Sequence, residues 1–166
     1  MTIESERSGM SINRSLVKDL LKMLLSINVY RAKFEAPFLA SSSATFKTEG
    51  LTMMADLNVT VFLQHVQKRL SQANEMVTNY LDSNTKSHLV GVIEDNLFTP
   101  HAKAITLMGF DGLMDEERVD ILTLFYKLME RVSKIDDLRE ALLAYVKTKV
   151  GSMLGSEVKL DEERRT

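Results

Sequence analysis

The chain has 166 residues, 45% of them hydrophobic and 27% charged, so it is long enough and apolar enough to bury the core of one domain. Its formal charge of −2 argues against a strongly basic nucleic-acid-binding protein, and we expect no nucleic-acid partner. Cysteine is absent, which excludes disulfide bonds, thiolate metal sites and cysteine nucleophiles.

The start of the sequence shows no basic leader followed by an apolar core, and no apolar run approaches the roughly 18 residues that suggest a membrane span. We therefore expect a soluble intracellular protein, located in the cytoplasm, the nucleus or both, without a membrane partner.

Apolar residues recur every three or four positions along nearly the whole chain, a spacing that predicts amphipathic helices. Ser11 or Asn13 is a suitable N-cap for the first helix. The apolar face of this helix carries Leu16, Leu20, Leu24 and Ile27.

Tyr30, Phe34 and Phe38 continue at intervals of four, but Pro37 lacks a backbone donor and disfavours helix at the residue before it. We therefore expect a short helix near residues 29–35. A second helix should have Pro37 in its first turn and run to about Leu57.

Thr60 is the expected cap of a long helix that ends near residues 82–85, and Thr85 begins another. Thr99 followed by Pro100 predicts a restart, as a cap with a proline at the first helical position. That helix should end at Gly109, because the glycines of residues 109–112 suit a tight connection.

Two further helices are expected after this connection. Asp115 should cap the first, which runs to about Val132, and Asp136 should cap the second. The expected domain covers residues 1–155, and residues 156–166 form a polar, disordered tail. With no convincing strand, the predicted fold class is all-α, built from stacked antiparallel helices.

Catalytic and metal-binding patterns are missing from the sequence. His65, His88 and His101 lie too far apart for two imidazoles to share a helix face, so we expect no metal site. Asp115, Glu116 and Glu117 resemble an acid/base cluster, but capping and compensation of the helix dipole explain them without chemistry. Phosphate-binding glycine loops and a nucleophile elbow do not occur, so we expect no enzyme activity and no cofactor.

Several segments, in collinear order, resemble the amino-terminal helical repeats of cullins. The resemblance covers about residues 3–163 and points to the second and third repeats, with the type-four cullins, and plant members among them, as the most similar class. The segments that carry it are IESERSGMSINRSLVKDLLKML, VYRAKFEAPFL, FLQHVQKRLSQANEMVTNYLDSNTKSHLVGVIEDNLF, GFDGLMDEERVDILTLFYKLMERV and DLREALLAYVKTKVGSML.

This resemblance implies a helical solenoid of about one and a half cullin repeats. It also implies a non-catalytic scaffold segment of, or derived from, a cullin-RING ubiquitin ligase, serving ubiquitin-dependent protein catabolism. The family's adaptor-binding helices, RING-recruiting domain and modified lysine have no counterpart here, so the resemblance assigns no partner-binding residue.

Two interpretations of the chain's partners stay open. In the first, the chain assembles with components of cullin-RING ligases; in the alternative, it is a stand-alone helical module that regulates or sequesters cullin partners. In a stack of repeats each face is covered by a neighbour, so we also expect exposed apolar ends and self-association through them. The expected ends are the helix with Tyr30, Phe34 and Phe38 and the last helix, with Tyr145, Val146 and Met153.

Overall fold

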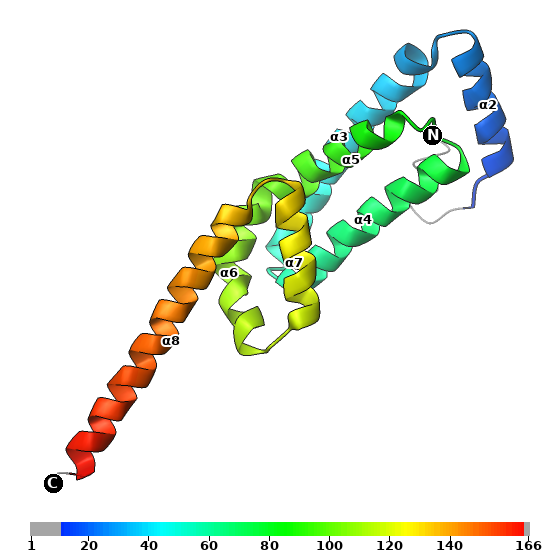
Figure 1. Cartoon of the computed structure of the whole chain (residues 1–166). Coiled ribbons are helices and arrows are strands. Elements are labelled where there is room, and N and C mark those ends of the chain that lie inside the picture. Colours follow the sequence, from blue (N-terminus) through cyan, green and yellow to red (C-terminus); the bar gives the residue numbers. More distant parts are fainter. Residues whose placement is uncertain (1–10, 165–166) are drawn as a thin grey trace. The chain divides into compact units, whose positions relative to one another are not determined.

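The structure is a computed structural model that describes residues 11–164 and, among side chains, those of residues 11–155 (Figure 1). Helices joined by short connections make up this part of the chain, and no strand occurs in it, so the all-α prediction is confirmed. The α-helices are α2 (Arg14–Ser26), α3 (Ala36–Ala55), α4 (Val59–Asn79), α5 (Thr85–Ile93), α6 (Ala102–Asp115), α7 (Val119–Arg131) and α8 (Ile135–Arg164). Two π-helical segments, η1 (Arg31–Glu35) and η2 (Glu94–Phe98), and one 3₁₀ segment, η3 (Thr99–His101), complete the set.

The chain folds as two compact units. Within the described residues, unit 1 comprises 11–56 and 64–99, and unit 2 comprises 57–63 and 100–164. Helix α4 contributes its first turn to unit 2 and the rest to unit 1. The backbone of α8 stays helical to Arg164, beyond the end near Gly155 that the sequence suggested. The division into a domain of residues 1–155 and a polar tail stays a prediction.

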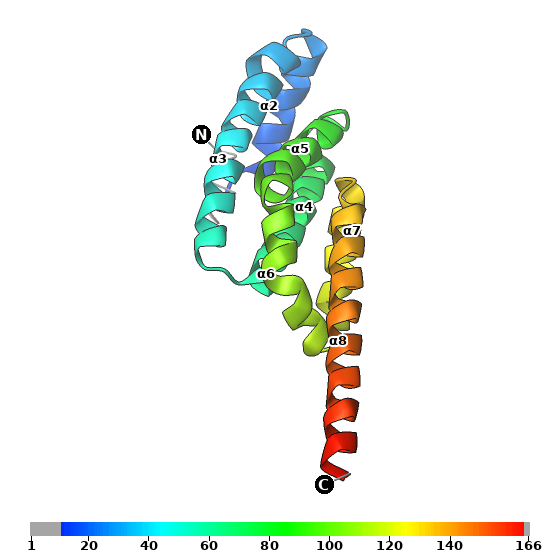
Figure 2. The ribbon, with the colours of Figure 1, turned by 90° about the vertical axis from the view of Figure 1, so that its left-hand side faces the viewer.

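In unit 1, helix α3 packs along α5 and η2 (Figures 1 and 2). Its buried residues follow each other at intervals of four, which places them on one side of the helix. They are Phe38, Ser42, Phe46 and Gly50. Because two of these four residues are small, the backbone of α3 can approach its neighbours closely there. The apolar side of the contact from α5 and η2 is formed by Leu89, Ile93, Leu97 and Phe98, which are all buried.

Both prolines of the chain follow a π-helical segment at the same distance. Segment η1 ends two residues before Pro37, and η2 ends two residues before Pro100. At each place a backbone N–H reaches back five residues, from Ala36 to the carbonyl of Arg31 and from Thr99 to that of Glu94. The predicted short helix before Pro37 is thus a π-turn, and the chain continues from it into α3 without an intervening loop.

The predicted helix starts are correct at Asn13 and wrong at Thr60. The Asn13 side chain accepts a hydrogen bond from the N–H of Leu16 at 3.0 Å, as an N-cap does. Helix α4 is capped instead by Asn58, whose side-chain oxygen accepts from the N–H of Val61 at 3.0 Å. Thr60 already lies inside the helix, because the cap is two residues upstream of the one we expected.

Unit 2 packs α6, α7 and α8 against one another. Its buried core consists mainly of Ile105, Phe110, Leu113, Ile121, Phe125, Leu128, Met129 and Leu138. The predicted connection at residues 109–112 is wrong, since α6 runs through it to Asp115. Gly109 instead serves packing: a Cβ there would lie 2.4 to 2.8 Å from side-chain atoms of Val59. The glycine therefore lets the first turn of α4 lie directly against α6.

Non-glycine residues with positive φ close four of the helices. They are Asn28, Leu57, Glu117 and Ser133, with φ between 51° and 57°. Each stands two residues after the end of its helix, the position that a left-handed C-cap occupies. At these four turns a residue other than glycine adopts the left-handed backbone conformation. The turns of this sequence are therefore not marked by glycines.

Candidate functional site

The three histidines lie in separate surroundings. His65 contacts Glu49, His88 contacts Glu35, and the ring of His101 meets that of Phe62 edge-on at 5.9 Å. Burial lowers the pKa of His101. Among the residues that the structure describes, no three His, Asp or Glu side chains gather as metal ligands would.

A chain of hydrogen bonds inside unit 1 ends on the buried carboxylate of Glu35. The Thr85 hydroxyl donates to Glu35 Oε2 at 2.7 Å, so its oxygen is left to accept from Tyr30, whose hydroxyl lies 2.9 Å away. The N–H of Asp82 donates in turn to the Tyr30 oxygen at 3.3 Å. His88 Nδ1 lies 3.2 Å from Glu35 Oε1. Burial raises the pKa of Tyr30. Its hydroxyl is therefore protonated and can donate the hydrogen bond to Thr85.

This chain of hydrogen bonds connects η1 to the start of α5. Glu35 and Thr85 are 50 positions apart in the sequence, so no local residue spacing indicates that they are in contact. The one available signal was a carboxylate set among aromatic residues at helical spacing, between Phe34 and Phe38. Its role is structural, because it satisfies buried polar groups that would otherwise destabilise the fold.

A second polar cluster joins α3 to α4. Glu49 accepts hydrogen bonds from Arg69 Nε at 3.0 Å and from a second guanidinium nitrogen of Arg69, and it lies 3.0 Å from His65 Nε2. Arg69 also donates to Gln72 at 2.8 Å. Burial opposes ionisation of Glu49, but the hydrogen bonds from His65 and Arg69 outweigh it and lower the pKa of its carboxyl. The cluster holds an ionised carboxylate in place.

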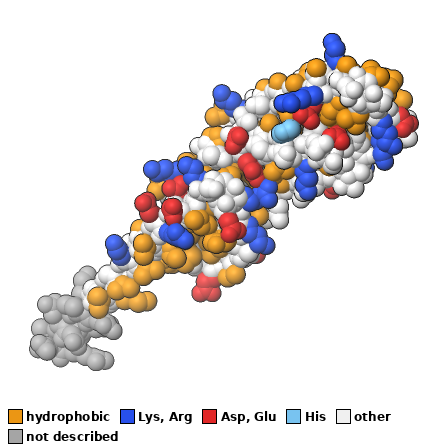
Figure 3. Space-filling model, turned by 45° about the horizontal axis from the view of Figure 1, so that its top comes forward, with side chains coloured by type: hydrophobic (Ala, Val, Ile, Leu, Met, Phe, Trp, Pro, Cys, Tyr) orange, Lys and Arg blue, Asp and Glu red, His pale blue; other side chains and the backbone are white. Residues whose placement is uncertain are grey.

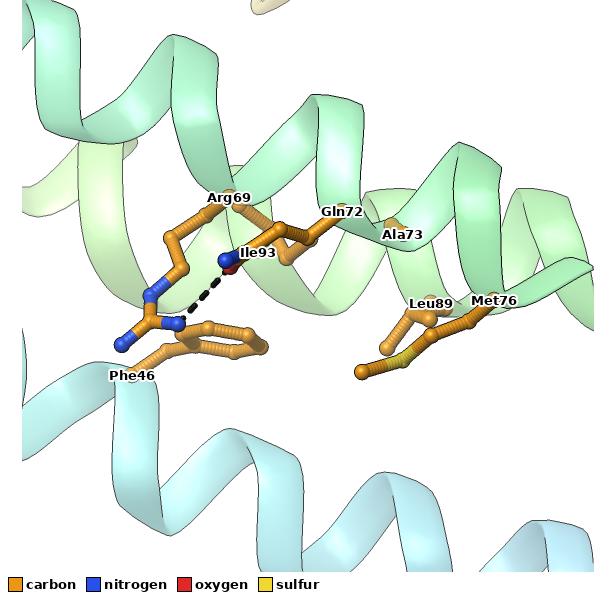
Figure 4. Close-up of a pocket in the computed structure, with 7 residues that line it drawn as sticks. All are labelled: Phe46, Arg69, Gln72, Ala73, Met76, Leu89 and Ile93. Atoms are coloured by element: carbon orange, nitrogen blue, oxygen red, sulfur yellow. Dashed lines mark hydrogen bonds between the residues drawn. The ribbon is translucent and has the colours of Figure 1, made fainter. Parts of the chain in front are cut away.

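A small cavity lies next to this cluster (Figure 4). The lining residues come from α3, α4 and α5 and are mostly apolar: Phe46, Arg69, Gln72, Ala73, Met76, Leu89 and Ile93. Its volume is about 10 Å³, on the order of one water molecule. Typical ligand pockets are at least thirtyfold larger, at roughly 300 Å³ or more. We therefore regard this cavity as a gap in the packing of unit 1.

The acidic cluster at residues 115–117 has a different role from the one we predicted. Asp115 is the last residue of α6, and α7 starts at Val119, so capping of α7 by Asp115 is wrong. Its carboxylate lies 2.6 Å from Lys149 Nζ and accepts from the Tyr145 hydroxyl at 2.7 Å. These bonds lower the pKa of Asp115 and raise those of Tyr145 and Lys149. Asp115 therefore fastens α8 to the end of α6 at the surface.

The expected exposure of apolar ends is wrong for one helix and confirmed for the other. Tyr30 and Phe38 are only 5% and 8% exposed. The ring of Phe34 stacks on that of Phe38 and is tilted by 50° to that of Tyr30, with its centroid 5.2 Å from each. On α8, in contrast, Val146 and Met153 are exposed as expected, whereas Tyr145 is only partly exposed and donates to Asp115. Figure 3 shows hydrophobic side chains along the part of α8 in view. A second exposed apolar face lies on α2 and comprises Leu16, Leu20, Met23 and Ile27.

The long series of amphipathic helices with two exposed apolar faces is typical of a repeat segment. A family profile described as the Cullin alpha solenoid domain matches residues 1–164. The chain belongs to the cullin family. The match to this profile also confirms the predicted helical solenoid of the cullin type.

Curated relatives agree with a cullin of the type-four class. Human and mouse Cullin-4A are each 39% identical over 132 residues, which cover 80% of this chain and 17% of the relative. Cullin-4 of Dictyostelium discoideum is 31% identical over 158 residues, covering 95% of this chain and 20% of that protein. The chain thus spans about one fifth of the length of these cullins. The finer expectation of a plant-type sequence stays a prediction.

In this cullin segment, none of the helices in the described part combines the length and the hydropathy that a membrane crossing needs. The features that stand out are a buried polar cluster around Glu35, a partly buried one around Glu49, and the apolar faces of α2 and α8. The clusters join helices within unit 1, while the side chains of the two faces are exposed and available for contact with other protein. We therefore place two separate candidate functional surfaces on this cullin segment, one on α2 in unit 1 and one on α8 in unit 2.

The Glu49 cluster predicts a pH-dependent contribution to stability. Glu49→Gln should lower the free energy of unfolding by about 1–2 kcal/mol at neutral pH, because the ion pair between Arg69 and both carboxylate oxygens is replaced by hydrogen bonding to one uncharged amide oxygen. Since the folded-state pKa of Glu49 is lowered, this contribution exists above the unfolded-state pKa and disappears as the pH falls through the folded-state pKa. Urea unfolding at a series of pH values measures it.

Glu75→Gln is the matched control, because Glu75 is exposed and lies on α4, the helix that carries Arg69. Its effect should be small at every pH. A loss of stability in Glu49→Gln that stays constant from about pH 7 to about pH 3 would contradict the assignment.

Proposed function

We propose that the chain is a non-catalytic scaffold segment of, or derived from, a cullin-RING ubiquitin ligase and serves ubiquitin-dependent protein catabolism. The match of residues 1–164 to the cullin α-solenoid is the observation that carries this proposal. Its proposed partners are protein components of such ligases, and its proposed location is the cytoplasm, the nucleus or both.

A segment of this kind acts through geometry. Packed helices hold the two ends of a longer scaffold at a set separation, which raises the effective concentration of the groups carried there. The polar clusters around Glu35 and Glu49 support this role, because each fixes one helix against another with several hydrogen bonds. The apolar faces of α2 and α8 support it as well, since each layer of a solenoid packs against the next.

A segment exchange tests the proposed role. Residues 1–164 would replace the matching segment of a full-length cullin, and ubiquitin transfer by the reconstituted ligase would be measured. We expect the exchanged scaffold to retain transfer, because the segment contributes separation and stiffness rather than reacting groups. A scaffold that still binds its adaptor and RING protein but no longer supports transfer would contradict the proposal.

The alternative function is a stand-alone module that regulates or sequesters cullin partners. The open faces of α2 and α8 favour it, because they offer apolar surface to other helical proteins. Affinity purification of the tagged chain from its own cells separates the two functions. Recovery of a RING protein together with an adaptor supports assembly into a ligase, whereas capture of one such component without the other supports sequestration.

A further inference from the structure

Helix α8 is held within unit 2 by different kinds of contact along its length. Near its start, Leu138 is buried in the core of unit 2. From residue 139 to residue 155, the last with a described side chain, no side chain is buried: Ala141 and Tyr145 are partly covered, and the others are exposed. Burial of apolar surface therefore anchors the first turn of α8 much more firmly than the turns that follow.

Beyond Leu138, a polar contact joins α8 to α6 and converges on one carboxylate oxygen. Asp115, the last residue of α6, accepts a hydrogen bond from the Tyr145 hydroxyl at 2.7 Å, and the same oxygen lies 2.6 Å from Lys149 Nζ. Tyr145 and Lys149 are four residues apart, so they lie on the same side of α8. Lys149 Nζ also lies 5.2 Å from the centre of the Tyr145 ring. We call Asp115, Tyr145 and Lys149 the α8 clasp.

The position of the clasp gives it leverage over α8. With a helical rise of 1.5 Å per residue, Lys149 lies about 16 Å further along α8 than Leu138. The first turn of α8 and the clasp thus hold the helix at two separate points. Loss of the clasp would leave only the first of these points with a buried side chain.

The two charges of the clasp are both present at neutral pH. The hydrogen bond between Asp115 and Lys149 lowers the pKa of the carboxyl group and raises that of the ammonium group. The side chains of Lys149 and Asp115 are nevertheless 45% and 49% exposed, so water and salt compete with their attraction. An exposed pair of this kind shifts a local equilibrium by a few fold rather than by orders of magnitude.

We propose that the α8 clasp is a releasable fastening, whose opening detaches residues 142–155 of α8 from α6 while Leu138 keeps the start of the helix in place. The detached stretch is a solvated helix end, which is only marginally stable in water. Because this stretch carries the exposed apolar face of α8, the clasp sets the direction in which that face is presented to the next layer of a solenoid. This last consequence rests on the proposed function, whereas the opening itself does not.

Hydrogen–deuterium exchange of the complete 166-residue chain, followed by mass spectrometry, tests the fastening. We expect Asp115→Ala to speed exchange in residues 142–155 about three- to fivefold, the change that loss of an exposed ion pair allows. Exchange in α7 and in the first turns of α6 should stay as it is. Salt at about 1 M should speed exchange of residues 142–155 in the unchanged chain, because it screens the ion pair, but not further in Asp115→Ala.

Asp111→Ala is the matched control, because Asp111 is exposed and lies one helical turn before Asp115 on α6. It should leave the exchange of α8 unchanged. A charge reversal separates a clasp from a purely structural role of Asp115: Asp115→Lys should speed exchange, and adding Lys149→Glu should slow it again, because the reversed pair restores the attraction. Circular dichroism of each variant verifies that the helices are intact.

The proposal is overturned if Asp115→Ala and Asp111→Ala exchange alike, if Lys149→Glu does not rescue Asp115→Lys, or if salt leaves the exchange of the unchanged chain as it was. Faster exchange throughout α6 and α7 would also overturn it, because that pattern means a general loss of stability. The segment exchange measures ubiquitin transfer and not the opening of α8, so failure of the proposed function and failure of the clasp give different results.

Discussion

Gly109→Ala is expected to lower the free energy of unfolding by about 2–3 kcal/mol, although alanine is the better helix former. The added Cβ would lie 2.4 Å from Val59 Cγ2 and 2.8 Å from both Val59 Cβ and Cγ1. Because Val59 Cβ is attached directly to the backbone, the clash cannot be relieved by turning the end of a flexible side chain. Helix α6 and the start of α4 must separate, which opens the core of unit 2 around them.

Gly112→Ala is the matched control, since it lies three residues further along α6 and has no atom within 4 Å of the added Cβ. It should raise the free energy of unfolding by about 0.5–1 kcal/mol through helix propensity alone. Val59→Ala removes both γ-methyl groups, so it should recover part of the loss when combined with Gly109→Ala. Equal effects of the two glycine substitutions in urea unfolding would show that the close approach is not what Gly109 provides.

Thr85→Val is expected to cost about 2–4 kcal/mol of folding stability with almost no change in side-chain shape. The Thr85 hydroxyl connects Tyr30 to Glu35, and Thr85 is fully buried. Valine removes one donor to the carboxylate and one acceptor for the phenol. The buried Glu35 side chain is then left with one hydrogen bond fewer. Chemical unfolding followed by circular dichroism measures the loss.

Thr78→Val is the matched control for this change. The hydroxyl of Thr78 donates only to the carbonyl of Asn74 in its own helix, and the residue is exposed. We expect an effect within about 0.5 kcal/mol. Adding Glu35→Gln to Thr85→Val should cost less than the two single effects together, because an amide tolerates the missing donor better than a carboxylate does. Strict additivity would mean that the two side chains do not act as one network.

Local signals in the sequence predicted much of the helical architecture. The cap at Asn13 depends on a contact between residues only three positions apart. The helical start near Pro37 depends on the backbone restriction that proline imposes. Both could therefore be predicted from residues close together in the sequence. The glycines at 109 and 112 were misread for the opposite reason. Gly109 is required by Val59, fifty positions away, and nothing near it in the sequence signals that contact.

The polar clusters escaped prediction for the same reason. Glu49 and Arg69 are 20 positions apart, and Glu35 and Thr85 are 50 apart, so only the packing of α3 against its neighbours brings them together. The aromatic rings at Tyr30, Phe34 and Phe38 were expected at an exposed end because the pattern shows an apolar face but not what covers it. The family resemblance was recoverable because it depends on the order of many segments rather than on any single contact.

The π-turn before Pro37 affects which insertions and deletions of single residues this segment can tolerate during evolution. Each residue in a helix turns the following ones by about 100°, so η1 accommodates one residue more than a regular helix would. Loss of a single codon within Arg31–Glu35 would therefore convert the π-turn into a regular turn and leave Phe38, Ser42 and Phe46 on the interior side, whereas the same loss inside α3 would turn the residues after it away by about 100°. The loss of one residue is consequently less disruptive within Arg31–Glu35 than within the regular turns of α3.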